Sequence, residues 1–177
     1  MRRGFGTILS LTFVLVAAGP AVGGPDRVAF PKDYAENFTL YDKIDKTKKK
    51  KNEKVRFMYA NPAALSVASG PLPSGSIIIM EDHAIEVNAD GTPKMGSTGR
   101  LLPTAEIKNV FTMEKRTGWG AAYPTDKRNG DWEYAWFQPD GKPKPGKTME
   151  KCFACHKAKA SGNDFVFTMK QIRAKAK

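Results

Sequence analysis

Both cysteines of the 177-residue chain lie in one short segment near its end, Cys152-Phe-Ala-Cys155-His156. This C-x-x-C-H pattern is typical of the covalent attachment of a c-type heme. Two thiols separated by about one helical turn can add to the two vinyl groups of a heme. The adjacent imidazole of His156 can then bind the iron. The sequence therefore predicts one covalently attached heme c per chain, bonded to Cys152 and Cys155, with His156 as the proximal iron ligand.

A disulfide, either structural or redox-active, is the alternative use of these two cysteines. A thioredoxin-like site would require a strand–helix–strand pattern early in the chain. Here the segment follows a series of expected strands and lies close to the end of the chain. Heme attachment is therefore the favoured interpretation.

The group on the other side of the iron is left open. A methionine there is typical of electron-transfer cytochromes. Met149 is too close to the motif to cross the heme plane, and Met169 lies in a short tail. His83, beside Glu81 and Asp82, is more typical of a surface position. An open or weakly occupied distal site, which binds NO, CO or a small nitrogen compound, is favoured. The other methionines considered, several of them expected core residues, are Met58, Met80, Met95 and Met113.

The segments before the motif are predicted to form mainly strands. Branched and aromatic residues indicate strands over residues 55–60, 76–87, 109–115 and 131–138, with a hairpin turn over residues 88–91. Helices are predicted from Asn61-Pro62 to Gly70, over 148–159 and over 165–175, while residues 32–41 suit a helix or an extended arm. The polar segment 42–54 is predicted to be a loop. This order favours an α+β fold, a mostly antiparallel β-sheet with flanking helices, over a four-helix bundle.

The first residues are typical of a secretory signal peptide. Arg2 and Arg3 precede an apolar run over residues 8–18, and the small residues Ala21 and Gly23 follow. The run is too short for a membrane-spanning helix, which needs about 20 residues. We therefore predict a signal peptide over residues 1–23, export to the periplasm, and a single heme c domain over residues 24–177.

Charge and composition narrow the class of partner. The chain has 29 basic and 18 acidic residues, a formal net charge of +11. An exported basic protein is not expected to meet nucleic acid, so the charge favours solubility or an acidic partner. The lysine-rich run from Lys46 to Lys51 is predicted to be a solvated loop, with a docking surface for an acidic redox protein as the alternative.

The composition also excludes two classes of protein. Two cysteines are too few for a disulfide scaffold, and 41% hydrophobic residues exclude a disordered or collagen-like chain.

Five further segments accompany the heme motif in a defined order. They are FPKDY at 30–34, VRFMY at 55–59, GSIIIME at 75–81, NGDW at 129–132 and DFVFT at 164–168. Together with the C-x-x-C-H motif, this set resembles the cytochrome P-460 family, which includes the closely related cytochromes c′-beta. The resemblance covers nearly all of the chain after the predicted signal peptide.

The resemblance implies a mostly antiparallel sheet, commonly in a homodimer, and a five-coordinate heme iron whose proximal ligand is the motif histidine. The best-known members oxidise hydroxylamine and carry a lysine that is covalently bonded to the heme. That lysine corresponds here to Met80, which has no nucleophilic nitrogen, so the cross-link is expected to be absent. The cytochromes c′-beta lack the cross-link and bind NO and CO in an apolar distal pocket, which Met80 would cap here.

Two candidate catalytic residues are assigned by the same resemblance. Arg56 resembles a polar residue near the distal pocket, and a surface strand arginine is the alternative. Glu114 resembles the acidic residue considered a proton acceptor in the hydroxylamine-oxidising enzymes. A strand-end carboxylate paired with Lys115 or Arg116 is the alternative for Glu114.

One function is favoured and two remain open. The favoured function is an exported mono-heme c-type cytochrome, similar to the cytochromes c′-beta, that binds NO or CO at an open distal site. The first alternative is a hydroxylamine oxidoreductase without the lysine–heme cross-link, with Glu114 as base. The second is an electron-transfer cytochrome c with Met80 or His83 as the sixth ligand, whose basic surface would face an acidic redox partner.

Overall fold

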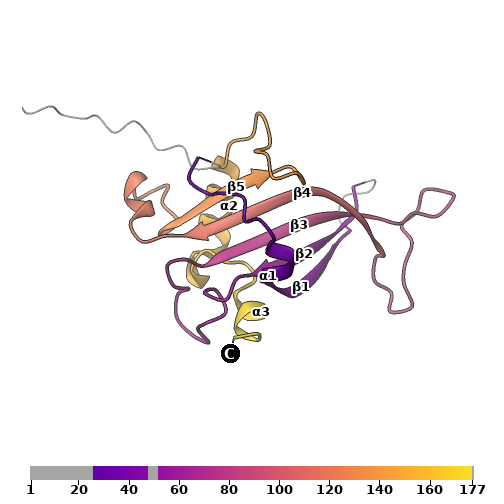
Figure 1. Cartoon of the computed structure of the whole chain (residues 1–177), viewed down its shortest axis with the longest axis horizontal. Coiled ribbons are helices and arrows are strands. Elements are labelled where there is room, and N and C mark those ends of the chain that lie inside the picture. The colour runs from indigo at the N-terminus through magenta and orange to yellow at the C-terminus, as the bar shows by residue number, and fades with distance from the viewer. Residues whose placement is uncertain (1–25, 48–51, 177) are drawn as a thin grey trace, which may run out of the picture.

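Five strands form one antiparallel sheet in which the strand order follows the chain order (Figure 1). The computed structural model describes residues 26–47 and 52–176. The predicted signal peptide and the lysines at 48–51 therefore lie outside the described residues. The strands are β1 (Thr39–Lys46), β2 (Lys54–Ala60), β3 (Ile77–Ile85), β4 (Pro103–Lys115) and β5 (Trp132–Phe137).

Side chains alternate between the two faces of this sheet and so build two cores. On the first face, Met58 of β2 pairs with Met80 of β3, and Met80 pairs with Phe111 of β4. On the second face, Ile79 and Val110 are fully buried in a cluster that includes the N-terminal segment. A strand buried on both faces has no polar side, which explains the continuous apolar run at the start of β3.

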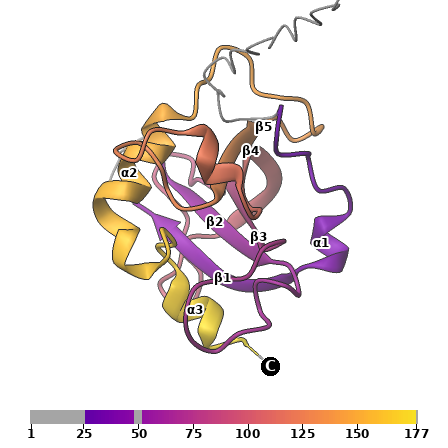
Figure 2. The ribbon, with the colours of Figure 1, turned by 90° about the vertical axis from the view of Figure 1, so that its left-hand side faces the viewer.

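The helices cover both faces (Figure 2). They are α1 (Tyr34–Asn37), α2 (Glu150–Ala160) and α3 (Met169–Arg173), with short 3₁₀ turns η1 (Trp119–Ala122) and η2 (Ser161–Asn163). α2 and α3 lie on the first face, and α1 lies on the second. Phe153, Met169 and Ile172 pack with strand residues in the first core. The C-terminal segment that carries the cysteines is therefore held against the first face.

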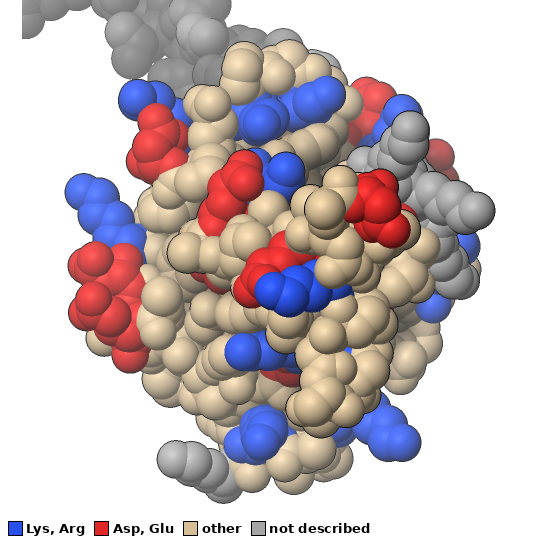
Figure 3. All heavy atoms as spheres, turned by 90° about the vertical axis from the view of Figure 1, so that its right-hand side faces the viewer, with Lys and Arg blue, Asp and Glu red and all other residues tan. Residues whose placement is uncertain are grey.

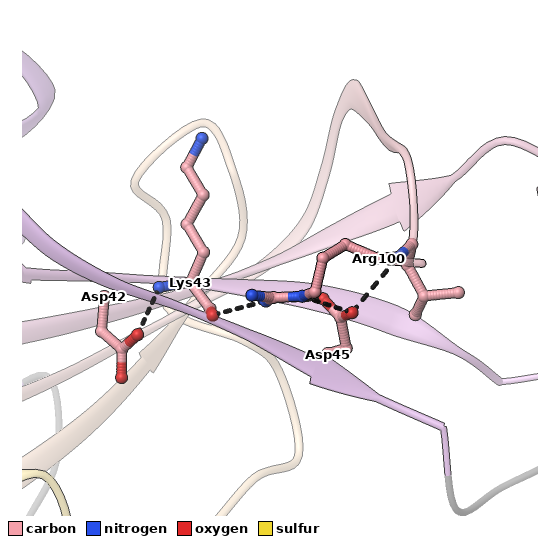
Figure 4. A network of polar contacts seen from close by, with 5 residues as sticks. Asp42, Lys43, Asp45 and Arg100 are labelled. Carbon is pink, nitrogen blue, oxygen red and sulfur yellow. Dashed lines mark hydrogen bonds and ion pairs between the residues drawn. The ribbon is translucent and has the colours of Figure 1, made fainter. Parts of the chain in front are cut away.

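Residues 86–102 form an arm that extends from the sheet at the right of Figure 1. Arg100 ties the arm to β1, because its Nε and Nη2 donate to the two carboxylate oxygens of Asp45 at 2.7 and 3.0 Å. Its Nη2 also donates to the Lys43 carbonyl at 2.7 Å (Figure 4). The hydrogen bonds that Arg100 donates to Asp45 lower the pKa of the Asp45 carboxyl. Acidic and basic side chains are interspersed on this side of the molecule (Figure 3).

The predicted α+β class is confirmed, and β2 to β5 correspond to the four predicted strands. The sequence does not predict β1, because most of its residues belong to the polar segment 42–54, and the loop predicted there is wrong for residues 42–46. β1 is an edge strand, where charged side chains are common because they discourage pairing with another chain. Only Tyr41 and Ile44 pack with the first core, and a bulge between Leu40 and Asp42 interrupts the alternation.

The helix predicted from Asn61 to Gly70 is also wrong, because the chain forms turns there. The side-chain oxygen of Asn61 accepts the N–H groups of Ala64 at 3.0 Å and Ile77 at 2.9 Å. Its amide nitrogen donates to the Gly75 carbonyl at 2.8 Å. Because one side chain binds both ends of the segment, Asn61 closes a loop rather than starting a helix.

The helix predicted over 148–159 is confirmed as α2, whereas the last helix, α3, is shorter than predicted. Asp164 and Phe165 have positive φ angles of 50° and 61°. A right-handed helix cannot continue through two such residues, so the helical turns of α3 begin only at Met169.

Candidate functional site

A cavity of about 610 Å³ lies between the first face of the sheet and the C-terminal segment. Apolar side chains from three neighbouring strands, Met58, Met80 and Phe111, form part of its wall. Residues of α2 and residues 166–168 also line it. The volume is typical of a site for a cofactor or another small molecule.

α2 brings the whole predicted heme motif to this cavity. Glu150 lies in the first turn of α2, and Lys157 and Lys159 lie in the last turn, so their charges complement the helix dipole. Phe153 fixes the helix on the sheet, with its ring 4.8 Å from that of Tyr134. Residues at i, i+3 and i+4 share one side of a helix. The cavity is accordingly lined by Cys152, Cys155 and His156.

The ring of His156 is oriented by a hydrogen bond to the backbone. Its Nδ1 lies 2.7 Å from the carbonyl oxygen of Phe165. A carbonyl only accepts hydrogen bonds, so Nδ1 carries the proton and Nε2 of the neutral ring has a free lone pair. Burial lowers the pKa of His156, which favours the neutral ring despite the Phe165 hydrogen bond. A neutral imidazole with Nδ1 hydrogen-bonded to a carbonyl is a typical metal ligand.

The two cysteines of α2 are free thiols, with Cys152 half-buried and Cys155 exposed. Burial, reinforced by the charge of Cys155, raises the pKa of the Cys152 thiol. A reactive dithiol instead needs a lowered thiol pKa, because the thiolate is the nucleophile in disulfide exchange. Burial therefore disfavours the Cys152 thiolate, the form that acts in disulfide exchange.

Arg56 also lines the cavity, where a buried carboxylate holds it. Its Nε donates to Oδ1 of Asp82 at 2.7 Å, and Lys54 donates to Oδ2 at 2.8 Å. Asp82 is almost completely buried, and the two basic side chains are about one quarter exposed or less. The ion pair keeps the Arg56 guanidinium at the cavity instead of in the solvent.

The family model of Cytochrome P460 matches residues 31–168, which is most of the chain and includes every cavity residue named above. The chain belongs to the cytochrome P460 family. This family implies a c-type heme protein. No curated protein matches the chain.

The cavity suits the heme that membership of the cytochrome P460 family implies. A heme is a flat apolar ring with two carboxylates, and the cavity combines an apolar wall with basic side chains. The basic residues that line it are Lys46, Arg56, Lys151 and Lys159, and none of the described lining residues is Asp or Glu. Cys152 and Cys155 would attach such a group, and His156 would bind its iron.

The structure does not bring two of the sequence-based candidates to the cavity. Glu114 is buried on the second face, and its Oε1 accepts from Nε of Arg116 at 2.6 Å. This is the ion-pair alternative considered above. His83 is engaged on the same face, with Nε2 at 2.7 Å from Glu81 and Nδ1 at 3.1 Å from the Thr104 carbonyl. The cavity residue next to Glu114 in sequence is Met113, because adjacent strand residues point to opposite faces.

The methionines considered as iron ligands separate into three groups. Met58, Met80 and Met113 line the cavity. Met149 and Met169 are buried in the first core. Met95 is exposed on the arm. The cavity methionines are therefore the three that come from neighbouring strands.

Sequence reasoning missed the basic residues of α2 that line the cavity. Lys151, Cys155 and Lys159 are spaced by four residues, which places them along one side of a helix. That spacing around the motif was the available signal. Sequence reasoning also missed the Phe165 carbonyl, and no side-chain pattern could have revealed it.

A carboxylate on the second face should make stability depend on pH. Glu133 is fully buried, and its Oε1 accepts from Nη1 of Arg27 at 3.1 Å. Burial raises the pKa of Glu133, and the charge of Arg27 and its hydrogen bond to Glu133 offset only part of this effect. The folded protein therefore binds the Glu133 proton more tightly than the unfolded chain does.

Replacing Glu133 by Gln should remove this pH dependence. Stability from Glu133 is complete below the unfolded pKa, near 4.5, and is lost as the pH rises through the higher folded pKa. At neutral pH, Glu133→Gln should increase the free energy of unfolding relative to the wild type, because the amide has no charge to bury. Urea unfolding below pH 4.5 and at neutral pH would measure this difference in the free energy of unfolding between variant and wild type. Glu106→Gln, at an exposed position, is the control. A variant less stable than the wild type at neutral pH would contradict this assignment.

Proteins of this family are typically exported. Among the helices of the described residues, none is long and apolar enough to cross a membrane.

Proposed function

We propose that the chain is an exported mono-heme c-type cytochrome that binds small ligands such as NO or CO on an open distal side. Cys152 and Cys155 attach the heme, and Nε2 of His156 binds its iron. The bound heme supplies an iron that can hold a diatomic molecule. The observation that carries the proposal is the orientation of His156, whose Nδ1 is held by the Phe165 carbonyl at 2.7 Å while the residue lines an apolar-walled cavity.

The chain's own residues support an open distal side. The part of the cavity wall formed by Met58, Met80 and Phe111 is apolar, and the lysines of the lining, Lys46, Lys151 and Lys159, come from β1 and α2. His83, the other histidine, lies on the second face with both ring nitrogens engaged. An apolar wall favours uncharged diatomic ligands over polar substrates.

The optical spectrum of the purified reduced protein, recorded before and after addition of CO or NO, tests the proposal. We expect a high-spin spectrum that shifts when either gas is added. A low-spin spectrum that neither gas changes would contradict the open distal site.

An electron-transfer cytochrome with Met80 as the sixth ligand is the second candidate. It is favoured by one observation, that three methionines line the cavity. In that case Met80→Leu should convert a low-spin iron to a high-spin iron, whereas Met95→Leu, on the exposed arm, should leave it unchanged. The hydroxylamine oxidoreductase alternative has less support, because Glu114 is paired with Arg116 on the second face.

An acidic protein is the proposed redox partner. Lys151 and Lys159 are exposed on α2, beside the exposed Cys155. Positive charges beside the heme would steer an acidic protein toward the edge where electrons can be exchanged. Export is proposed from the pattern of residues 1–23, and the homodimer remains an expectation from the family resemblance.

A further inference from the structure

The carbonyl that orients His156 belongs to a residue in an unusual conformation. Asp164 and Phe165 both have positive φ angles, 50° and 61°. Residues other than Gly, Asn and Asp rarely adopt this region, because their Cβ approaches the backbone carbonyl. Phe165 has no short polar side chain that could compensate. The surrounding structure must therefore hold the two residues in place.

Asp164 ties this turn to two distant parts of the chain. Its Oδ2 accepts the backbone N–H of Leu72 at 2.8 Å. Nζ of Lys115, at the end of β4, donates to both carboxylate oxygens at 2.9 Å. The two charged side chains are only 14% and 12% exposed, so water screens their attraction weakly. Asp164 is thus joined to the loop before β3 and to the sheet.

Phe165 is held by one contact of its backbone and one contact of its ring. Its backbone N–H donates to the Ala160 carbonyl at 2.8 Å, at the C-terminal end of α2. Its ring packs against Gly130, where an added Cβ would come within 3.4 Å of the ring. The Phe165 carbonyl belongs to the next peptide unit, whose Val166 N–H donates to the Asn163 carbonyl at 2.9 Å and closes the turn that has Asp164 and Phe165 at its centre. The Phe165 carbonyl points at Nδ1 of His156.

We infer that Asp164 is a positioning residue for His156, and that its bonds to Lys115 and Leu72 hold the Phe165 carbonyl against the imidazole. This inference rests on the proposed function, because it assigns His156 to the heme iron. A hydrogen bond from Nδ1–H to a fixed acceptor makes the ring a better electron donor to a metal. Removing the bonds of Asp164 to Lys115 and Leu72 should therefore weaken the iron–imidazole bond and disfavour the ferric state.

Three variants of the heme-loaded protein test the inference. Asp164→Ala removes both interactions of the carboxylate. Asp164→Asn keeps an oxygen for the Leu72 N–H and tolerates the positive φ, but loses the charge. Lys115→Met leaves the Leu72 bond and removes only the ion pair. Glu86→Gln is the matched control, because it breaks the exposed ion pair of Glu86 with Lys94.

The readouts are the ferrous iron–imidazole stretching band in resonance Raman spectra and the midpoint reduction potential. We expect Asp164→Ala to shift the band to lower frequency and the potential to more positive values. Asp164→Asn and Lys115→Met should give smaller shifts of the same sign, and Glu86→Gln should give none. If Asp164→Ala does not accumulate as folded protein, the other two variants provide the same comparison.

A purely structural role would give a different result. Thermal unfolding would then occur at a lower temperature in the Asp164 and Lys115 variants, while the band and the potential stay at the wild-type values. That result would overturn the inference and leave the proposed function intact. A wild-type protein without any iron–imidazole band would contradict the proposed function, and with it this inference.

Discussion

Replacing both cysteines of α2 by serine is expected to abolish covalent attachment of the heme. Cys152 and Cys155 are the only cysteines of the sequence, and both line the cavity beside His156. A serine hydroxyl is close in size to the thiol but does not form the thioether bond. The double variant should therefore lose all heme on denaturation, while each single variant should keep one bond to it.

Heme staining after denaturing electrophoresis, together with intact mass, measures this effect. Ala154→Ser is a suitable control, because Ala154 lies between the two cysteines and is exposed. It adds the same hydroxyl to α2 and leaves both thiols in place. If the double variant still carried the mass of the heme after denaturation, the attachment assigned to Cys152 and Cys155 would be wrong.

Replacing Met80 by lysine is expected to abolish the spectral response to CO and NO. Met80 is partly buried in the cavity wall between Met58 and Phe111. Lysine has a similar unbranched side chain, so it can follow the same path and bring its amine into the cavity. An apolar environment lowers the pKa of a lysine, which favours the neutral amine with its free lone pair. Such an amine would compete with the gas for the distal side.

The same variant tests whether Met80 occupies the position of the family's cross-linking lysine. Met80→Lys can be combined with the double cysteine-to-serine replacement, which by itself should release the heme. Heme that remains bound after denaturation of the combined variant would reveal a new bond from residue 80. Met95→Lys, on the exposed arm, is the matched control. An unchanged gas response together with complete heme release would show that residue 80 does not face the heme.

Local sequence determined the parts of this protein that depend on short-range spacing. The motif residues at 152, 155 and 156 fall on one side of α2 because the helical repeat fixes their directions. The apolar and aromatic runs of β2 to β5 fix strands, since such side chains fit a sheet that is covered on both faces. The α+β class followed from the order of these segments.

Tertiary structure decided which side chains share a site. Glu114 and Met113 are adjacent, so only one can face the cavity, and the pairing of Met113 with Ile78 and Tyr134 selects Met113. β1 forms because it can add to the edge of β2, although its own residues are largely polar. These outcomes depend on strand register, which neighbouring strands fix jointly.

His156 illustrates both contributions, because the sequence predicts the residue as a ligand and tertiary contacts orient its ring. The sequence places an imidazole beside the two cysteines, but the group that orients it is the backbone carbonyl of Phe165. That carbonyl takes its direction from a turn that Lys115 and Leu72, both far away in sequence, hold through Asp164. The type and position of His156 in the sequence therefore predict a candidate iron ligand. Its orientation is set by contacts that exist only after the sheet, the loop before β3 and the C-terminal segment have come together.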